Sequence, residues 1–167
     1  MWKPRIVVVE DVALEAKLLL RTLFNFGYTS VVHFSDVSSA LGHMAVEEPE
    51  IVITDLSLGA QSGFDLTRAI RARASKSYAY VIVLTGMDSR IHEAFGAGVD
   101  DFVLKPFRPE ELLARLRAGE RVLARESRLR GRERRLLPDA PPATARFPSR
   151  PPLLLPVRPE DDDAECA

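Results

Sequence analysis

Three short apolar runs, rich in β-branched residues, most constrain the fold because each ends in residues that carry chemistry. They are 6–9 before Glu10 and Asp11, 51–54 before Asp55, and 102–104 before Lys105. Unbroken apolar runs of this length are typical of strands that are buried on both faces of a parallel sheet. The chain is therefore expected to fold around such a sheet.

The polar residues that end these runs predict a common site. Ligands of an open α/β sheet bind at the carboxyl ends of its strands, so side chains that follow the three strands should converge there. Carboxylates and an ammonium in one crevice describe a site for a divalent cation, with room for a phosphoryl group.

Strands and helices alternate from about Arg5 to about Arg121, which indicates a parallel sheet covered on both faces. Two further strands are expected at 31–34 and 80–84. The expected helices cover 12–26, 35–47, 62–74 and 89–95, and a fifth begins after Pro109. This order predicts a doubly wound α/β domain.

Local signals predict several helix boundaries. Gly27 should end the first helix, and Ser35 is expected to cap the second. Ser62 and Asp65 have the spacing of a capping box for the third. The side chains predicted to face the core are Leu14, Leu18 and Leu19 in the first helix, Phe64, Leu66 and Ile70 in the third, and Leu112, Leu113 and Leu116 in the fifth.

Further motifs stand in order with the strand-end residues. They are Thr85-Gly86 after the fourth strand, Lys105-Pro106-Phe107 after the fifth, Gly63 eight residues beyond Asp55, and the run 96–102. With the acidic residues, this ordered set resembles the receiver domain of two-component response regulators, the CheY-like family, over about residues 4–120. The resemblance implies a five-stranded parallel sheet with the flavodoxin-like strand order 2-1-3-4-5. The family often has proline where Gly59 stands, and tyrosine is common where Phe102 stands.

The resemblance also implies a phosphorylation site. Asp55 would be the phosphoacceptor, and Asp11 and Asp55 would ligate Mg²⁺. Glu10 would support the ion directly or through water, and the backbone carbonyl of Ser57 would complete the protein ligands. Hard oxygen ligands in small number suit Mg²⁺, which keeps positions for water and a phosphoryl oxygen. Taken singly, strand-end acids can equally be helix caps or solvated loop residues.

A lysine, a threonine and an aromatic residue complete the implied site. Lys105 would pair with the phosphoryl group as a point charge, and its bond to Pro106 is expected to be cis, as is typical in the family. The Thr85 hydroxyl would bind a phosphoryl oxygen, and Phe102 would turn inward when Thr85 moves, giving a two-state switch. The alternative for Phe102 is a permanent core aromatic.

The composition changes after the receiver-like part. Residues 115–135 hold nine arginines against three glutamates, and Val122, Leu129 and Leu136 recur every seven residues, which is half of a coiled-coil signal. From Pro138 the chain is rich in proline and ends in acidic residues, which favours disorder. The predicted division is a receiver domain at 1–121, an arginine-rich helical extension at 122–137 and a disordered tail at 138–167.

The extension predicts a homodimer by one of two routes. The helices of two chains would pair in parallel, or the fourth and fifth helices would meet across a two-fold axis. The second route would use Asp100 or Asp101 with Arg115 as reciprocal ion pairs.

Overall composition is compatible with a cytoplasmic signalling protein. The single cysteine, Cys166, rules out a disulfide framework, and no apolar run approaches the length of a membrane span. The net charge of -1 argues against a surface built entirely for nucleic acid.

The expected function is a phosphorylation-controlled switch that receives its phosphoryl group from a histidine kinase or phosphotransfer protein. Its only expected catalysis is the formation and hydrolysis of its own aspartyl phosphate. One alternative is a DNA-binding regulator that uses the basic helix. Another is a phosphatase with Asp55 as nucleophile, although Ser57 stands where haloacid-dehalogenase hydrolases carry a second acid.

Overall fold

The computed structural model describes residues 3–73, 77–86, 93 and 96–136 of the 167-residue chain. Its elements in chain order are β1 Ile6–Val9, α1 Ala13–Asn25, β2 Val31–Phe34, α2 Val37–Val46, β3 Ile51–Asp55, β4 Ser57–Leu58, β5 Gln61–Ser62, α3 Gly63–Ala72, β6 Tyr80–Thr85, β7 Asp101–Leu104 and α5 Pro109–Leu136.

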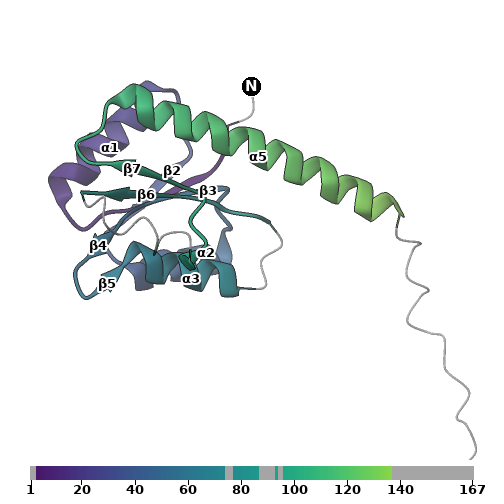
Figure 1. Ribbon diagram of the computed structural model, residues 1–167, viewed down its shortest axis with the longest axis horizontal. Helices are drawn as coiled ribbons and strands as arrows, with labels where there is room; N and C mark the ends of the chain where they lie inside the picture. The colour runs from purple at the N-terminus through teal and green to yellow at the C-terminus, as the bar shows by residue number, and fades with distance from the viewer. Residues whose placement is uncertain (1–2, 74–76, 87–92, 94–95, 137–167) are drawn as a thin grey trace, which may run out of the picture.

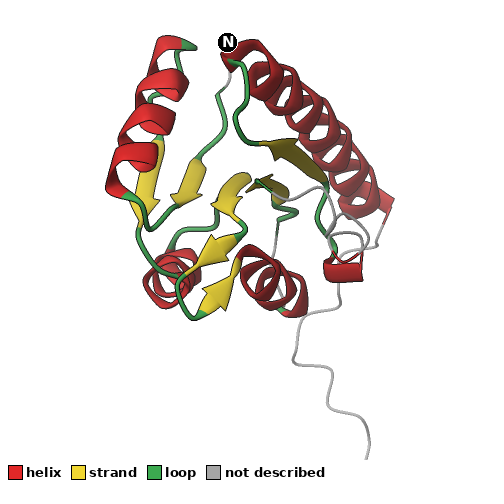
Figure 2. Ribbon diagram, turned by 60° about the vertical axis from the view of Figure 1, so that its left-hand side comes forward, coloured by secondary structure: helices red, strands yellow, loops and turns green. Residues whose placement is uncertain are grey.

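Five parallel strands form the central sheet, in the order β2-β1-β3-β6-β7. Counting only these strands, the order is 2-1-3-4-5, as predicted. Helices α1 and α5 lie on one face of the sheet and α2 and α3 on the other (Figures 1 and 2). The doubly wound α/β fold is therefore confirmed.

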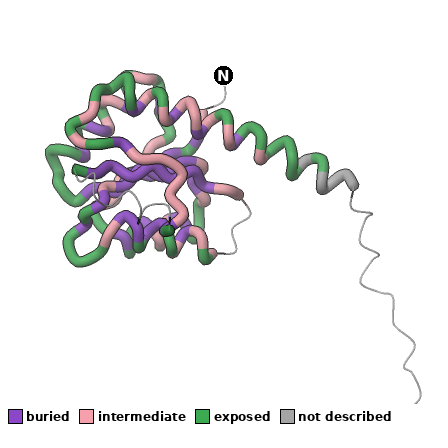
Figure 3. The backbone as a smooth tube through the Cα atoms, viewed as in Figure 1, coloured by how far each residue is buried: buried purple, intermediate pink, exposed green. Residues whose placement is uncertain are grey.

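The strands are buried because both faces of the sheet are covered. Val7 and Val9 pack with α2 and α3, while Ile6 and Val8 pack with α1 and α5. Successive side chains of a strand point to opposite faces, so an unbroken apolar run supplies both cores at once. Figure 3 shows this buried sheet at the centre of the domain.

The predicted inward face of α1 is partly wrong. Leu14 and Leu18 are 68% and 57% exposed, whereas the buried residues of α1 are Ala16, Leu19 and Leu23. Both sets fit a helical spacing, and the packing of the domain selects the second. The inward residues predicted for α3 are confirmed, as are Leu112 and Leu116 as buried residues of α5 and Leu113 as a partly buried one.

The helix caps agree with the sequence prediction except in α2. Its N-cap is Asp36, not Ser35, because the Asp36 side chain accepts a hydrogen bond from the Ser39 backbone N–H. Ser62 and Asp65 form the predicted capping box of α3. Gly27 follows α1 with a φ of 79°, a conformation that glycine adopts without steric cost.

A short hairpin of β4 and β5 was not predicted from the sequence. It joins β3 to α3, and its turn holds Gly59 at a φ of 61°. Proline is locked near a φ of about −65°, so the glycine at this position has a conformation that proline cannot adopt. Two-residue strands carry too little periodicity to be recognised in a sequence.

Helix α5 continues beyond the sheet (Figures 1 and 3). Leu123 is buried, and Val122 packs partly against the same core, so the helix leaves the domain only after these residues. Leu129 is exposed. Asp100 and Asp101 pair with Arg71 and Arg115 of the same chain.

Some sequence predictions lie outside the described residues. They concern most of the helix expected at 89–95 and the tail from 138 onward. The boundaries predicted for the three segments of the chain stay a prediction. No helix in the described part of the chain combines the length and apolarity needed to cross a bilayer.

Candidate functional site

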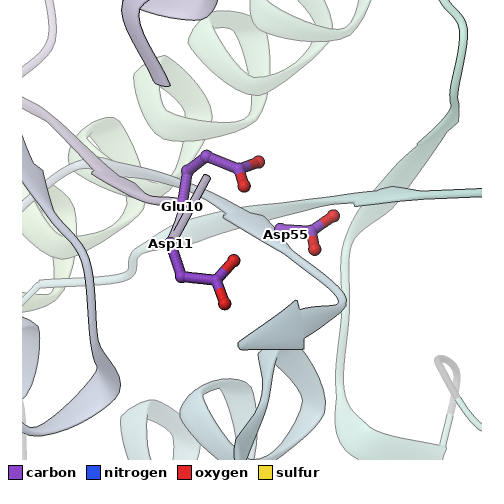
Figure 4. Close-up of side chains that lie close together, drawn as sticks. All are labelled: Glu10, Asp11 and Asp55. Atoms are coloured by element: carbon purple, nitrogen blue, oxygen red, sulfur yellow. The ribbon is translucent and has the colours of Figure 1, made fainter. Parts of the chain in front are cut away.

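The acidic residues converge at the carboxyl ends of two neighbouring strands. Val9 of β1 pairs with Thr54 of β3, which brings the following Glu10 and Asp55 side by side. One carboxylate oxygen from each of Glu10, Asp11 and Asp55 lies within 4.8 Å of the others, and Figure 4 shows the three side chains gathered. Hard oxygens at this spacing fit a small divalent cation such as Mg²⁺.

Glu10 is the most deeply placed of these acids, with a residue exposure of 1%. Burial raises the pKa of its carboxyl, while hydrogen bonds from the Val12 N–H and from Lys105 oppose that rise. The backbone is held as well, because Nε2 of His33 donates to the Glu10 carbonyl at 2.9 Å.

The ammonium of Lys105 lies among the carboxylates. Its Nζ is 2.7 Å from Oδ1 of Asp55 and 3.1 Å from Oε2 of Glu10. Burial lowers the pKa of Lys105, but hydrogen bonds to Asp55, Glu15 and Glu10 raise it by more, so the pKa stands above its usual value. The lysine is therefore a permanent positive charge at the site, and its bond to Pro106 is cis, as the resemblance implied.

The segment after Asp55 folds back tightly against that residue. The Ser57 backbone N–H donates to Oδ2 of Asp55 at 3.0 Å, and the Gly63 N–H donates to the Leu56 carbonyl at 2.9 Å. The metal-ligand role of the Ser57 carbonyl stays a prediction.

Thr85 and Phe102 lie on neighbouring strands near the site. Thr85 ends β6 and is buried, and its carbonyl accepts a hydrogen bond from the Lys105 backbone N–H at 2.7 Å. Phe102 pairs with Val83 in the sheet and is half-buried. Their predicted roles in a switch stay predictions.

Glu15 belongs to the same cluster, although the sequence did not indicate it. It lies in the first turn of α1, and its Oε2 is 2.5 Å from Nζ of Lys105, which is 90 residues away in the chain. No motif contains Glu15, so only the fold brings it to the site.

An open groove of about 470 Å³ runs beside the cluster, between α1 and the start of α5. Glu10, Glu15 and Lys105 line it at the polar end, and the remaining lining residues are mostly apolar: Leu18, Leu19, Thr22, Leu84, Pro106, Phe107 and Pro109. The exposed Leu14 and Leu18 lie on the same helix.

Comparisons with known proteins agree with this geometry. The response regulator receiver domain family matches residues 6–117. The chain is 35% identical over 118 residues to the DNA-binding response regulator MtrA of Mycolicibacterium paratuberculosis, an alignment that covers 70% of this chain and 51% of MtrA. The chain thus spans about half the length of the curated relatives that it matches.

Two solved structures are similar over nearly their whole length. The BeF3-activated receiver domain of DrrB is 30% identical with a TM-score of 0.63, covering 72% of this chain and 99% of that domain. The receiver domain of the sensor histidine kinase PA1611 from Pseudomonas aeruginosa, with a magnesium ion coordinated in its active-site cleft, is 25% identical with a TM-score of 0.63. It covers 70% of this chain and 97% of that domain. Since the family match spans most of the chain and the fold agrees, this chain belongs to the response regulator receiver domain family of two-component signalling.

Proposed function

We propose that this chain accepts a phosphoryl group on Asp55 from a histidine kinase or phosphotransfer protein and signals through protein contacts. The observation that carries this proposal is the contact of the Lys105 ammonium with Asp55 at 2.7 Å, beside two further carboxylates. An aspartate can attack phosphorus only if the repulsion between two anions is offset, and a fixed cation at the nucleophile provides such an offset.

The reaction is a displacement at phosphorus. A carboxylate oxygen of Asp55 forms a bond to phosphorus, and the bond from phosphorus to the donor breaks, with its electron pair leaving on the donor. Lys105 neutralises negative charge on the transferred phosphoryl group, and the Thr85 hydroxyl donates a hydrogen bond to one of the phosphoryl oxygens. The side chain of Phe102 then turns inward, which changes the surface that a partner protein meets.

Glu10, Asp11 and Asp55, with the Ser57 carbonyl, are the residues that would hold Mg²⁺. Bound there, the ion would supply further neutralisation of phosphoryl oxygens. The spacing of the three carboxylates within 4.8 Å supports this assignment, and the magnesium ion in the PA1611 receiver domain is a precedent within the family.

The groove beside the site suits the donor protein. Its apolar lining, together with the exposed Leu14 and Leu18 of α1, offers a surface on which a partner helix would bury apolar area next to Asp55. A donor bound there would present its phosphorylated histidine to the nucleophile.

Incubation with acetyl phosphate and Mg²⁺ tests the proposal, with intact mass as the readout. One phosphoryl mass is expected on the wild type, none on Asp55→Asn and none in the presence of EDTA. Asp36→Asn is the matched control, because asparagine caps α2 as well as aspartate does, and it should be phosphorylated normally. Uptake at the wild-type level by Asp55→Asn would refute the assignment. No turnover of a generic phosphomonoester is expected.

A second candidate function is binding to nucleic acid. The described part of α5 that extends past Leu123 exposes Arg125, Arg128, Arg130 and Arg132, and Arg121 is exposed one turn earlier. Such a helix can neutralise phosphates without reading a sequence, so binding to random duplex should fall steeply with salt. The relatives named MtrA are DNA-binding regulators, but the chain matches only half of their length. If the chain does not bind random duplex DNA even at low salt, this candidate function is excluded.

A further inference from the structure

Lys105 has three carboxylate partners, one of which belongs to neither the predicted metal ligands nor the phosphoacceptor. Its Nζ lies 2.7 Å from Asp55, 3.1 Å from Glu10 and 2.5 Å from Glu15. An ammonium group has three N–H donors, so these three contacts account for all of them. The phosphoryl oxygens of a phosphorylated Asp55 would lie farther out than its present carboxylate oxygens, so Lys105 can follow them only by loosening its contacts with the other two carboxylates.

The three partners differ in how easily they can release the lysine. Asp55 carries the incoming group, so its own contact is converted rather than lost. Glu10 is buried and also accepts from the Val12 N–H, so moving it would leave a carboxylate without its partners in the interior. The Glu15 side chain is 47% exposed and has solvent to turn into.

We propose that Glu15 is a positioning residue that holds Lys105 in the unphosphorylated state and competes with the phosphoryl group for its ammonium. This inference rests on the proposed function of Asp55. Phosphorylation then requires the Lys105 ammonium to move away from Glu15 toward the phosphoryl oxygens, and the strength of the Glu15–Lys105 pair sets part of the barrier. The pair also ties α1 to the segment between β7 and α5.

Replacement of Glu15 by glutamine tests the competition. Glu15→Gln keeps the size of the side chain and removes its charge, so phosphorylation by acetyl phosphate should be about threefold faster, the size expected of a half-exposed ion pair. Glu110→Gln removes a carboxylate from the first turn of α5, where the described residues show no ion pair to Lys105, and should leave the rate unchanged.

A double-mutant cycle separates the proposed role from a general effect of charge. In a Lys105→Met background, Glu15→Gln should no longer change the rate, because the residue through which Glu15 acts is gone. An equal acceleration in both backgrounds would show that Glu15 merely repels the anionic donor, and the proposal would be wrong. An unchanged rate in the wild-type background would also overturn it.

A second measurement needs no phosphoryl donor. Lys105 is acylated with an amine-reactive reagent, and the extent of labelling is read by peptide mass spectrometry. Labelling should be severalfold faster in Glu15→Gln, because the amine must break contacts with two carboxylates instead of three before it can react. Equal labelling rates in the wild type and in Glu15→Gln would show that Glu15 does not hold Lys105. If the wild type takes up no phosphoryl group while labelling still rises, the proposed function fails and the competition with it, but the Glu15–Lys105 contact stands.

Discussion

A side chain on Gly63 would place its first carbon 2.4 Å from the backbone carbonyl oxygen of Asp55. That distance is far below van der Waals contact, so the start of α3 can lie against the end of β3 only with glycine at this position. The sequence singled out Gly63 for its spacing from Asp55, and the structure supplies the steric reason.

The first prediction concerns this close approach. Gly63→Ala should destabilise the fold by about 1–3 kcal/mol, because the backbone of β3 or α3 must shift to admit the methyl group. Gly42→Ala is the matched control, since Gly42 lies within α2 and a Cβ there meets nothing within 4 Å. This control should stabilise by about 0.5–1 kcal/mol. Urea unfolding of both variants measures the difference, and equal effects would contradict the steric account.

The second prediction concerns Mg²⁺ and Lys105. The Lys105 ammonium contacts the carboxylates of Glu10 and Asp55, which would also be ligands of Mg²⁺. The positive charge of the lysine repels the positive charge of the ion. Lys105→Met should therefore bind Mg²⁺ about fivefold more tightly, from roughly 1 kcal/mol of relieved competition. Calorimetric titration reports the affinity, with Lys17→Met on the exposed side of α1 as control. Weaker binding in Lys105→Met would show that the lysine organises the carboxylates rather than competing for them.

The third prediction concerns pH, through the three tyrosines of the chain. Burial raises the pKa of Tyr78 and Tyr80 to about 12, with further contributions from Asp100 and Asp101 respectively. Burial and the hydrogen bond to Glu120 raise the pKa of Tyr28 as well.

The sign of the effect follows from these raised values. An unfolded tyrosine ionises near about pH 10, so the stabilising contribution is complete below that pH and is lost as the pH rises toward 12. Absorbance of tyrosinate should therefore stay low through pH 10 to 11 in the folded protein, then rise together with the loss of circular dichroism. Ionisation of all three tyrosines near pH 10 in the folded state would contradict the buried hydrogen bonds.

The fourth prediction concerns the proposed homodimer. Asp100, Asp101 and Arg115 already form ion pairs within one chain, so the structure favours pairing of α5 over reciprocal ion pairs. Val122 packs on the domain, which leaves Leu129 as the exposed apolar residue of the described seam. Light scattering should give a dimer mass for the wild type and a monomer mass for Leu129→Lys.

A matched variant controls for the loss of an exposed apolar side chain. Val46 is exposed on α2, away from α5, and Val46→Lys should remain a dimer. Truncation after Arg128 keeps the buried Leu123 and should also give a monomer. A monomeric wild type at micromolar concentration, with or without phosphorylation, would rule out both routes of assembly.

The main features of the site were predictable because they depend on local sequence. An apolar run that forms a strand places the next residue at the edge of the sheet, so Glu10, Asp55 and Lys105 were located once the strands were recognised. The capping box of Ser62 and Asp65 involves residues three apart and was confirmed for the same reason.

Tertiary structure decided the features that involve distant segments. The sequence of α1 has leucines at 14, 18, 19, 20 and 23, so its spacing permits more than one buried face, and only packing against the sheet selected Leu19 and Leu23. The same rotation of α1 directs Glu15 to Lys105, across 90 residues of chain. Periodicity fixes which residues share a helix face, but the rotation of that face toward the core depends on the other elements against which it packs.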